Sequence, residues 1–333
     1  MSKFTITIIG AGVIGTSLGL ALKQQDDPPI LLAHDKDLGV ASAAAKLGAF
    51  DKAEWNLINA CEKADLVILA IPLSGVEATL KAIGPELKPN AVVTDTCPSK
   101  QPVLAWAAEH LPDSVHFVGG NPLVRPPGSG AANARADLFR ERLYCLTPAP
   151  GAHEEAVELL VGLASLVGAE PFFLDPAEHD GLATAVEHLP RLLSVALMRT
   201  LATPGSWREI RKMAGGTFEQ ISAGAEGDPD GIKDNFVENR EMLLHWLDST
   251  MAELGHLRGL LSGGNSDSGE ALAQAIDEAV VNRRDWLKEY RQGHIIEPEL
   301  AAMRPAEIPG FWQRWLGFGS MGKKRGDDQD KRR

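Results

Sequence analysis

The sequence predicts an α/β protein in which a doubly wound parallel sheet is followed by a domain of helices alone. Three observations support this fold class. Residues 3–35 read as a strand, a glycine-rich turn, a helix and a second strand. Apolar runs bounded by turn residues then alternate with helical stretches up to residue 175, which is typical of a parallel sheet covered by helices on both faces. Beyond residue 175 only helical patterns remain.

The glycine-rich turn has the G-x-G-x-x-G spacing of a Rossmann-type dinucleotide site. It follows the β-branched run Thr5–Ile9 and precedes a stretch of helical composition over residues 16–23. In such a turn the first glycine bends the chain, the second lets the backbone approach a pyrophosphate, and the third lets helix and strand pack closely. The N–H groups at the start of the helix bind the phosphates. We therefore expect cofactor contacts from Gly10, Gly12, Val13, Ile14 and Gly15.

The second strand ends at Asp35, twenty residues beyond Gly15. A carboxylate at this place accepts hydrogen bonds from ribose hydroxyls and repels a 2′-phosphate, which favours NAD over NADP. NADP stays open because Lys36 is adjacent and offsets part of that charge. Ligands in open α/β sheets bind at the carboxyl ends of the strands, so we expect further cofactor contacts from Ile71, Pro72 and Thr96.

The other elements of this domain follow in order. A helix is predicted over 38–47 with Gly48 as its stop, and a strand buried on both faces over 65–72. Next come a helix over 75–87, a strand over 91–95, a polar turn over 96–100, a helix over 100–110, a strand over 115–118 and a turn over 119–122. A Gly/Pro-rich loop over 123–134 is expected at the ligand edge. A strand over 140–147, a helix over 154–167 and a strand over 171–174 complete the domain.

Helices are predicted over 179–201, 207–214, 229–261 and 270–292. Within the third, apolar residues recur at three- and four-residue steps, which indicates an amphipathic stripe: Phe236, Met242, Leu243, Trp246, Leu247, Met251 and Leu254. By analogy with other dehydrogenases, such a domain buries its apolar faces in a homodimer. We therefore divide the chain into a dinucleotide-binding domain (1–175), a helical dimerisation and substrate domain (176–295) and a partly disordered tail (296–333).

The tail carries four aromatic residues and then the charged run KKRGDDQDKRR; the aromatic residues are Phe311, Trp312, Trp315 and Phe318. Either they form an interfacial membrane segment, or they pack on the body or a partner while the end is disordered. We favour packing, since the apolar stretch is short.

Composition limits the function classes. A chain of 333 residues suggests two domains, and its formal net charge of −12 argues against non-specific binding of nucleic acid. Its three cysteines lack metal-ligand spacing and cannot all pair, which suits a reducing cytoplasm. The chain enters a strand at once, unlike a signal peptide, and no apolar run approaches the roughly 20 residues of a membrane span. We expect a soluble cytoplasmic protein with no bound metal.

The order of motifs resembles that of the prephenate/arogenate dehydrogenases of tyrosine biosynthesis. The resemblance runs from about residue 4 to residue 260. It rests on the glycine fingerprint and on six further segments: VILAIP (67–72), TDTCPSK (94–100), GGNPLVRPPGSG (119–130), ADLFRERLYCLTP (136–148), EHDGLATAVEHLPRLL (178–193) and MAGGTFEQISAGAEGDP (213–229). These are similar to the family's "GGHP…SG", "LF…LTP", "HD…SHLPH" and "GGF.D.TRIA.SDP" stretches, among others.

The resemblance implies an NAD-dependent oxidoreductase that removes a hydride from the ring carbon bearing a hydroxyl, while loss of a carboxylate aromatises the ring. This chemistry needs a base, a partner for the hydroxyl and cations for two substrate carboxylates. A neutral histidine suits the base because its pKa lies near the working pH. The planar fork of arginine suits the carboxylates.

The sequence departs from the family at those positions. Asn121 stands at the histidine of "GGHP", and an amide cannot take the proton. Pro98 stands at the serine of "GSVK", with Ser99 one position late, and Ala223 stands at the arginine of "TRIA". In "SHLPH" the serine is Glu187 and the second histidine is Arg191, whereas the positions kept from the family are His179, His188 and Lys100.

We therefore take His188, Asn121 and Ser99 as candidate catalytic residues. The candidate substrate-binding residues are Arg191, Arg125 and His179. Each has a plainer alternative. His188 orients a neighbour, Arg191 pairs with Glu187, Arg125 is a solvated loop residue, and His179 holds the domain junction. Ser99 and Thr96 satisfy backbone groups in their turn, and Cys97 lacks a base that would activate it.

Three functions follow from this pattern. The first is a dehydrogenase of the prephenate type with a rebuilt pocket for a small carboxylate substrate. The second keeps NAD but acts on a different small acid, which would explain why the departures fall on substrate positions. The third is an NAD-binding regulatory homologue without turnover.

Overall fold

The computed structural model describes residues 3–149, 151–202, 205–292 and 312. The chain forms two compact units, with the boundary between His179 and Asp180. Of the described residues, those up to 179 and residue 312 belong to the first unit, and those from 180 to 292 belong to the second. We call them the nucleotide unit and the helical unit and describe each by itself.

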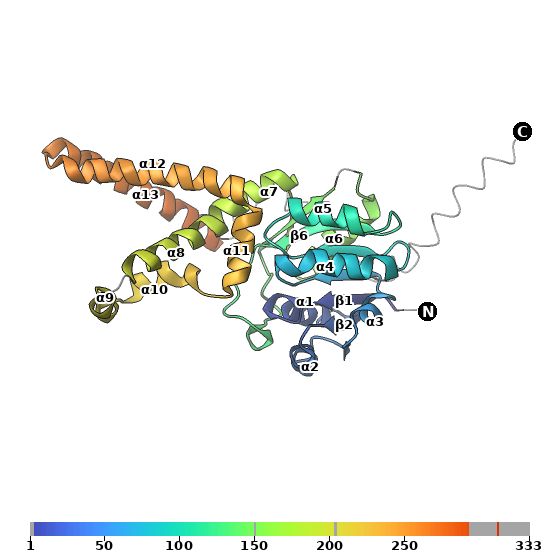
Figure 1. Ribbon diagram of the computed structural model, residues 1–333. Helices are drawn as coiled ribbons and strands as arrows, with labels where there is room; N and C mark the ends of the chain where they lie inside the picture. Colours follow the sequence, from blue (N-terminus) through green and yellow to red (C-terminus); the bar gives the residue numbers. More distant parts are fainter. Residues whose placement is uncertain (1–2, 150, 203–204, 293–311, 313–333) are drawn as a thin grey trace, which may run out of the picture. The chain divides into compact units, whose positions relative to one another are not determined.

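The nucleotide unit is built on an eight-stranded sheet in the order β3-β2-β1-β4-β5-β6-β7-β8 (Figure 1). All neighbouring strands are parallel except β6 and β7, which are antiparallel. The strands are β1 Thr5–Ile9, β2 Ile30–His34, β3 Lys52–Ala53, β4 Leu66–Leu69, β5 Val92–Asp95, β6 His116–Pro122, β7 Leu143–Pro148 and β8 Glu170–Phe173.

Helices cover both faces of this sheet, so the predicted doubly wound architecture is confirmed. The helices are α1 Val13–Lys23, α2 Leu38–Lys46, α3 Leu57–Cys61, α4 Leu73–Ile83, α5 Gln101–His110 and α6 Glu154–Leu166, with short 3₁₀ turns η1 Gly84–Glu86 and η2 Ala131–Asn133. One buried apolar cluster joins α1, α2 and α6 to one face of the sheet, and a second joins α3, α4 and α5 to the other. Strand β4 is buried along its whole length between the two clusters.

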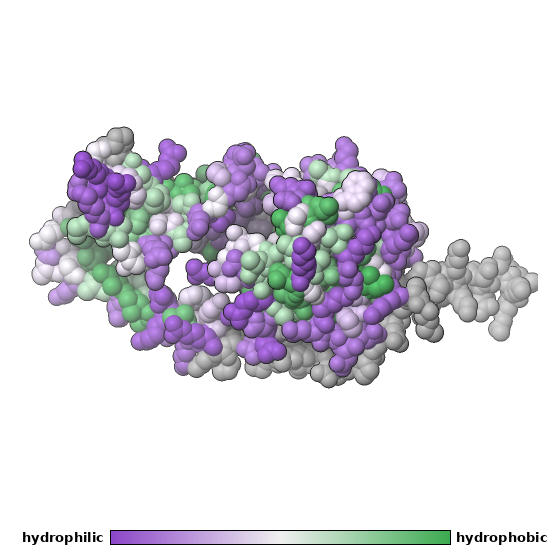
Figure 2. All heavy atoms as spheres, turned by 90° about the horizontal axis from the view of Figure 1, so that it is seen from below, coloured by the Kyte–Doolittle hydropathy of each residue, from purple (hydrophilic) through white to green (hydrophobic). Residues whose placement is uncertain are grey.

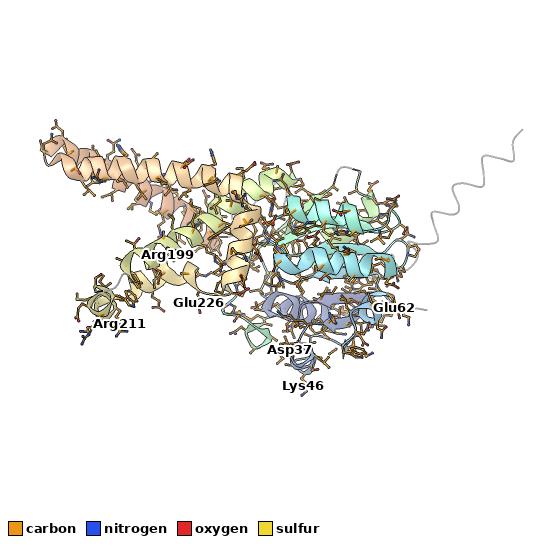
Figure 3. The ribbon with its side chains drawn as sticks, viewed as in Figure 1. Asp37, Lys46, Glu62, Arg199, Arg211 and Glu226 are labelled. Atoms are coloured by element: carbon orange, nitrogen blue, oxygen red, sulfur yellow. The ribbon has the colours of Figure 1, made fainter. Side chains whose placement is uncertain are left out.

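Helix α2 shows how the local sequence sets its ends. The carboxylate of Asp37 at the N-cap accepts a hydrogen bond of 2.8 Å from the Gly39 amide, and Lys46 lies in the last turn (Figure 3). An acid at the N-cap and a base in the last turn match the helix dipole. Gly48 then adopts a φ of +84°, which is why the helix stops where the sequence predicts.

The prediction of a turn over 119–122 is wrong, because these residues extend strand β6. They form the antiparallel ladder with β7, in which Gly120 faces Leu146 and Asn121 faces Cys145. Two glycines permit this close packing: a Cβ on Gly119 would lie 2.3 Å from Thr147 Oγ1, and one on Gly120 would lie 2.7 Å from the Asp95 carbonyl oxygen. Asn121 therefore belongs to a strand. The short elements β3 and α3 have no counterpart among the predicted elements.

The helical unit contains helices of very different length. They are α7 Pro176–Ala183 (which begins in the nucleotide unit), the π-helical turn η3 Thr184–His188, α8 Leu189–Leu201, α9 Trp207–Met213, α10 Gly216–Ser222, η4 Ala223–Ala225, α11 Pro229–Glu238, α12 Arg240–Gly263 and α13 Ser266–Gln292. The predicted helix over 229–261 is divided at Asn239, where the backbone leaves the helical region. Helix α10 was not predicted, because glycine and threonine open it.

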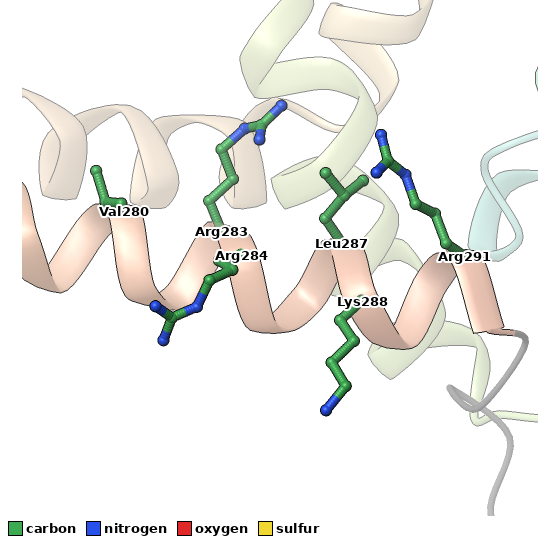
Figure 4. A pocket seen from close by; sticks show the side chains of 6 residues that line it. All are labelled: Val280, Arg283, Arg284, Leu287, Lys288 and Arg291. Atoms are coloured by element: carbon green, nitrogen blue, oxygen red, sulfur yellow. The ribbon is translucent and has the colours of Figure 1, made fainter.

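Helices α12 and α13 expose many apolar side chains, and Figure 2 shows such patches on this unit. The exposed side chains on these two helices include Leu244, Met251, Leu254, Leu261, Ile276, Val280 and Trp286. Along α13, a groove of about 680 Å³ runs past Val280 and Leu287, with Arg283 and Arg291 on the same side and Arg284 and Lys288 on the other (Figure 4). A helix pair with such faces is suited to a further partner.

Of the tail aromatics, only Trp312 is among the described residues. Trp312 is 5% exposed, and its ring lies 4.9 Å, centroid to centroid, from the ring of Phe4, the residue before β1. The expectation of packing on the body is therefore confirmed for this residue. Phe311, Trp315, Phe318 and the final charged run lie outside the described residues. Within the described ranges, none of the helices combines the length and the apolar character needed to cross a membrane.

Candidate functional site

Two glycines close the turn at the carboxyl end of β1. Gly10 has a φ of +96°, and a Cβ there would lie 2.2 Å from the Ala70 carbonyl oxygen. A Cβ on Gly15 would lie 2.0 Å from the Gly10 carbonyl oxygen. No larger residue fits at either place, so the first and third glycines of the fingerprint serve the packing that the sequence predicts.

Gly12 differs from both, because a Cβ there would meet nothing within 4 Å. It is the N-cap of α1, and no side chain caps the N–H groups of the first turn, which includes Val13 and Ile14. Open space in front of unpaired backbone donors is what a pyrophosphate requires. This cradle fits a dinucleotide.

Asp35 is fixed beside the same turn. One of its carboxylate oxygens accepts a hydrogen bond of 2.9 Å from the Ala11 amide, and the other accepts one of 3.0 Å from the Asp37 amide. The half-buried carboxylate keeps lone pairs for further donors. Lys36 next to it is exposed.

The ends of β4 and β5 complete this edge. The side chain of Ile71 borders the Gly10 turn, where a Cβ on Gly10 would come within 2.9 Å of Ile71 Cγ2. Pro72 caps α4. The hydroxyl of Thr96 donates to the Leu69 carbonyl at 3.4 Å, which is the kind of contact that the plainer alternative expects of a turn residue. Ser99 is fully buried.

A buried ion pair joins β5, α5 and β6. Lys100 and Asp95 are both fully buried, and the ammonium group donates to the Asp95 carboxylate and, at 2.6 Å, to the Gly120 carbonyl. The Asp95 carboxylate also accepts the amides of Cys97 at 2.9 Å and Gly120 at 3.1 Å. The pair therefore holds the backbone immediately before Asn121. The sequence analysis named Lys100 as a position shared with the family but did not name Asp95. The feature that could have indicated Asp95 is an acidic residue at the end of an apolar strand.

Asn121 and His179 meet at the carboxyl end of β6. The amide nitrogen Nδ2 of Asn121 lies 3.1 Å from Nε2 of the His179 imidazole, and the two residues are 4% and 2% exposed. The sequence singled out both residues but placed them in separate roles. The structure brings them into one hydrogen-bonded pair.

Two other side chains of this edge are held in their neutral forms. Burial and the negative charge of Asp95 raise the pKa of the Cys97 thiol far above its ordinary value. The same two causes raise the pKa of the Tyr144 hydroxyl. Neither is ionised near neutral pH, so Cys97 is unsuited to nucleophilic attack and Tyr144 to taking a proton.

In the helical unit, His188 and Arg191 lie at the junction of η3 and α8. His188 is buried, with Nε2 at 3.4 Å from Nδ2 of Asn239. The turn η4 packs against α8 so closely that a Cβ on Gly224 would lie 3.0 Å from Arg191 Cα. Position 223, where the sequence has alanine in place of a family arginine, is therefore a neighbour of Arg191.

Arg125, by contrast, is exposed on the loop after β6. Among the residues that the structure describes, no group of three or more histidine, cysteine or acidic side chains is arranged to hold a metal ion.

Two family descriptions match the chain, one after the other. The nucleotide-binding domain of prephenate dehydrogenase matches residues 18–172, and the dimerization domain of prephenate dehydrogenase matches residues 175–278.

Individual relatives agree with this. The prephenate dehydrogenase of Bacillus subtilis (strain 168) is 28% identical over 316 residues, covering 94% of this chain and 81% of that protein. The cyclohexadienyl dehydrogenase of Zymomonas mobilis is 26% identical over 264 residues, covering 79% of this chain and 90% of that protein. Among solved structures, prephenate dehydrogenase from A. aeolicus in complex with hydroxyphenyl propionate and NAD⁺ has a TM-score of 0.77 and 25% identity, over 86% of this chain and 99% of that chain.

Proposed function

The chain belongs to the prephenate/arogenate dehydrogenase family, and from this premise we propose that it oxidises a cyclohexadienyl carboxylate of the prephenate type with NAD⁺ and releases CO₂. The observation that carries the proposal is the intact dinucleotide edge: the Gly10 turn, the open space at Gly12 and the fixed carboxylate of Asp35. Bound NAD⁺ supplies the hydride acceptor. Asp35 supports NAD⁺ rather than NADP⁺, because a carboxylate at the end of the second strand accepts hydrogen bonds from ribose hydroxyls and repels a 2′-phosphate.

Arg191 is our candidate for the cation that holds a substrate carboxylate. It replaces the charge missing at Ala223, and the packing of η4 against α8 supports the exchange because the two positions are neighbours. An arginine presents five donors in a planar fork. An arginine at position 191 in place of one at position 223 can therefore still bind a carboxylate with two hydrogen bonds. His188 shares its face of the helix three residues earlier.

We also propose that the chain forms a homodimer through the helical unit. The match to a dimerization domain and the exposed apolar side chains of α12 and α13 support this. Sedimentation equilibrium of the full chain tests it, and a monomer at micromolar concentration would contradict it. A cytoplasmic location remains a prediction from the three free cysteines.

The deciding experiment measures reduction of NAD⁺ and NADP⁺ by the purified full chain with prephenate and with arogenate, alongside calorimetric binding of each cofactor. We expect turnover with NAD⁺. Tight binding of NAD⁺ without turnover of either substrate would contradict the proposal. It would leave a dehydrogenase of another small acid, or a regulatory homologue.

The variant Arg191→Ala tests the anchor. Loss of a charge-assisted contact should raise KM for the substrate roughly 10- to 100-fold while the Kd for NAD⁺ is unchanged. Arg199→Ala is the matched control, because Arg199 is an exposed arginine on the same helix (Figure 3). Equal effects of the two substitutions would refute the assignment of Arg191.

A further inference from the structure

The dehydrogenation requires a proton acceptor near the substrate hydroxyl, and the amide of Asn121 cannot serve as one. From the pairing of Asn121 with His179, we infer that His179 is the proton acceptor and that Asn121 positions it and polarises the substrate oxygen. The inference rests on the proposed function and names the residues that carry its proton transfer.

Four other titratable side chains at this end of the sheet, Asp95, Cys97, Tyr144 and Asp35, are unsuited to accept the proton. Both oxygens of the Asp95 carboxylate are bonded to Lys100 or to backbone amides. The Cys97 thiol and the Tyr144 hydroxyl stay neutral, as described above. Asp35 belongs to the cofactor end of the edge.

The other histidines of this unit lie away from the carboxyl end of β6. His34 bonds the Glu54 carbonyl with Nδ1 at 3.0 Å on the β2 side. His110 ends α5 with Nε2 at 3.5 Å from the Glu77 carboxylate. His116 lies at the amino end of β6, at the other end of the strand from Asn121, and the ring of His153 lies 4.7 Å from the His116 ring. Among the described residues of the nucleotide unit, this leaves His179 as the imidazole that reaches the carboxyl end of β6.

His179 is held on a rigid frame. Its amide donates to the Asp175 carbonyl at 2.8 Å, and the Asp175 carboxylate accepts the Ala177 amide at 2.8 Å, which caps the first turn of α7. The preceding strand β8 pairs with β7, and β7 pairs with β6 at the level of Asn121.

Asn121 is held from the other side. The Lys100–Asp95 pair bonds both the amide and the carbonyl of Gly120. The side chains of Asn121 and His179 are therefore preorganised by separate parts of one sheet.

The pairing gives the proposed state of the imidazole. Because Nδ2 of Asn121 can only donate, Nε2 of His179 accepts in this state and the ring proton lies on Nδ1. A lone pair is thus presented at the carboxyl end of β6. The substrate hydroxyl takes over this lone pair, and the Asn121 amide then donates to the hydroxyl oxygen.

The proton and electron balance is complete. The O–H bond of the substrate breaks and its proton goes to Nε2 of His179, while the C–H electron pair leaves as hydride and a C=O bond forms. The bond to the departing CO₂ then breaks, and its electron pair enters the ring and generates a phenolate. His179 returns the proton to that oxygen, so the imidazole ends neutral as it began, and the Asn121 amide stabilises the negative charge on the oxygen.

The first test reads the imidazole directly. Long-range ¹H–¹⁵N correlation spectra of the full chain labelled at histidine, with the His179→Gln variant for assignment, should show His179 neutral with its proton on Nδ1. Asn121→Leu should shift the Nε2 resonance of His179. A proton on Nε2 in the wild-type protein would overturn the inference without reference to any substrate or cofactor.

The second test is kinetic. His179→Gln should lower kcat about 10²- to 10⁴-fold, as expected for loss of a general base, with the Kd for NAD⁺ unchanged. Imidazoles added to His179→Gly should restore turnover with rates that follow the pKa of the added base, a response that a merely structural histidine does not give. His153→Gln, at the opposite edge of the sheet, is the control and should keep wild-type kcat.

The outcomes separate the two proposals. An active wild-type enzyme whose His179→Gln variant is equally active, or whose His179→Gly variant recovers independently of the pKa of the added base, overturns the role of His179 alone. A wild-type enzyme that turns over neither prephenate nor arogenate refutes the proposed function, and this inference with it. If His179→Gln fails to fold, the wild-type spectrum decides, with the His179 resonance assigned through its shift in Asn121→Leu.

Discussion

Replacing Lys100 by methionine tests whether the buried ion pair holds the site together. The substitution keeps the length of the side chain but removes the ammonium group that bonds Asp95 and the Gly120 carbonyl. Removing one partner of a buried pair leaves an uncompensated charge and typically costs about 3–5 kcal/mol. Asp95 retains the amides of Cys97 and Gly120, so we expect the lower end, about 3 kcal/mol.

The second variant isolates the charge. In Asp95→Asn/Lys100→Met no buried charge remains, and the amide oxygen of the new asparagine can still accept a backbone N–H. The double variant still loses stability, because the Gly120 carbonyl has no Lys100 donor and an amide oxygen accepts backbone N–H groups more weakly than a carboxylate does. We expect this loss to be roughly 1–2 kcal/mol. The double variant should therefore be more stable than Lys100→Met alone, a non-additivity that a double-mutant cycle measures directly.

Urea unfolding of the full chain is the assay, and the transition of the nucleotide unit is identified by its shift to higher urea with added NAD⁺. Lys88→Met is the matched control, because the Lys88–Asp65 pair is also close, at 2.5 Å, but is partly exposed. That variant should lose at most about 1 kcal/mol. Equal losses from Lys100→Met and Lys88→Met, or a double variant no more stable than Lys100→Met, would refute the reasoning.

Three further predictions concern the nucleotide unit. Gly12→Ala should leave the unfolding midpoint nearly unchanged, because its Cβ meets nothing within 4 Å. It should weaken NAD⁺ binding roughly 10- to 100-fold in calorimetry, because the methyl group fills the pyrophosphate cradle; unchanged affinity would argue against this cradle. Burial, and then the neighbouring His153, lower the pKa of His116 below its ordinary 6.5. The neutral His116 ring therefore contributes stability above pH 6.5, and this contribution is lost as the pH falls towards the lower pKa of the folded state. The variant His116→Asn should for this reason show a smaller decline of Tm from about pH 7.5 to about pH 5. Trp312→Ala should destabilise the nucleotide unit by about 3 kcal/mol, as for other buried large aromatic residues, whereas Trp55→Ala, at a ring that is 70% exposed, should change stability by less than about 0.5 kcal/mol.

Much of the fold could be predicted because its signals are local. Strand β1 was predicted to its exact residues and α2 to within one residue, because a β-branched run and a glycine stop act on their immediate neighbours. The glycine fingerprint was predictable for the same reason, since Gly10 and Gly15 each avoid a clash with atoms of the same turn or of the segment after β4, and Gly12 leaves open space in front of the helix. Trp312 packs on Phe4 as the tail composition suggested, although no local pattern named its partner.

The sequence could predict which residues belong to the candidate site but not which of them are in contact. Asn121 and His179 are 58 residues apart in sequence, and their contact depends on the antiparallel pairing of β6 with β7 and on the position of α7 after β8. The sequence analysis did not predict this contact, because two glycines followed by asparagine and proline have the composition of a turn and not of a strand. Only packing against Thr147 and Asp95 makes the segment a strand.

The sequence by itself determined the α/β class, the dinucleotide edge with Asp35, the family and the positions at which this chain departs from it. Those features follow from periodicity, motif spacing and residue chemistry, which are local properties of the chain. The tertiary structure decided which of the candidate residues meet. It placed His179 against Asn121 and Arg191 beside position 223, and it closed Lys100 and Asp95 into a buried pair. Such pairings depend on sheet register and on helix packing between distant segments, and no local pattern specifies either of them.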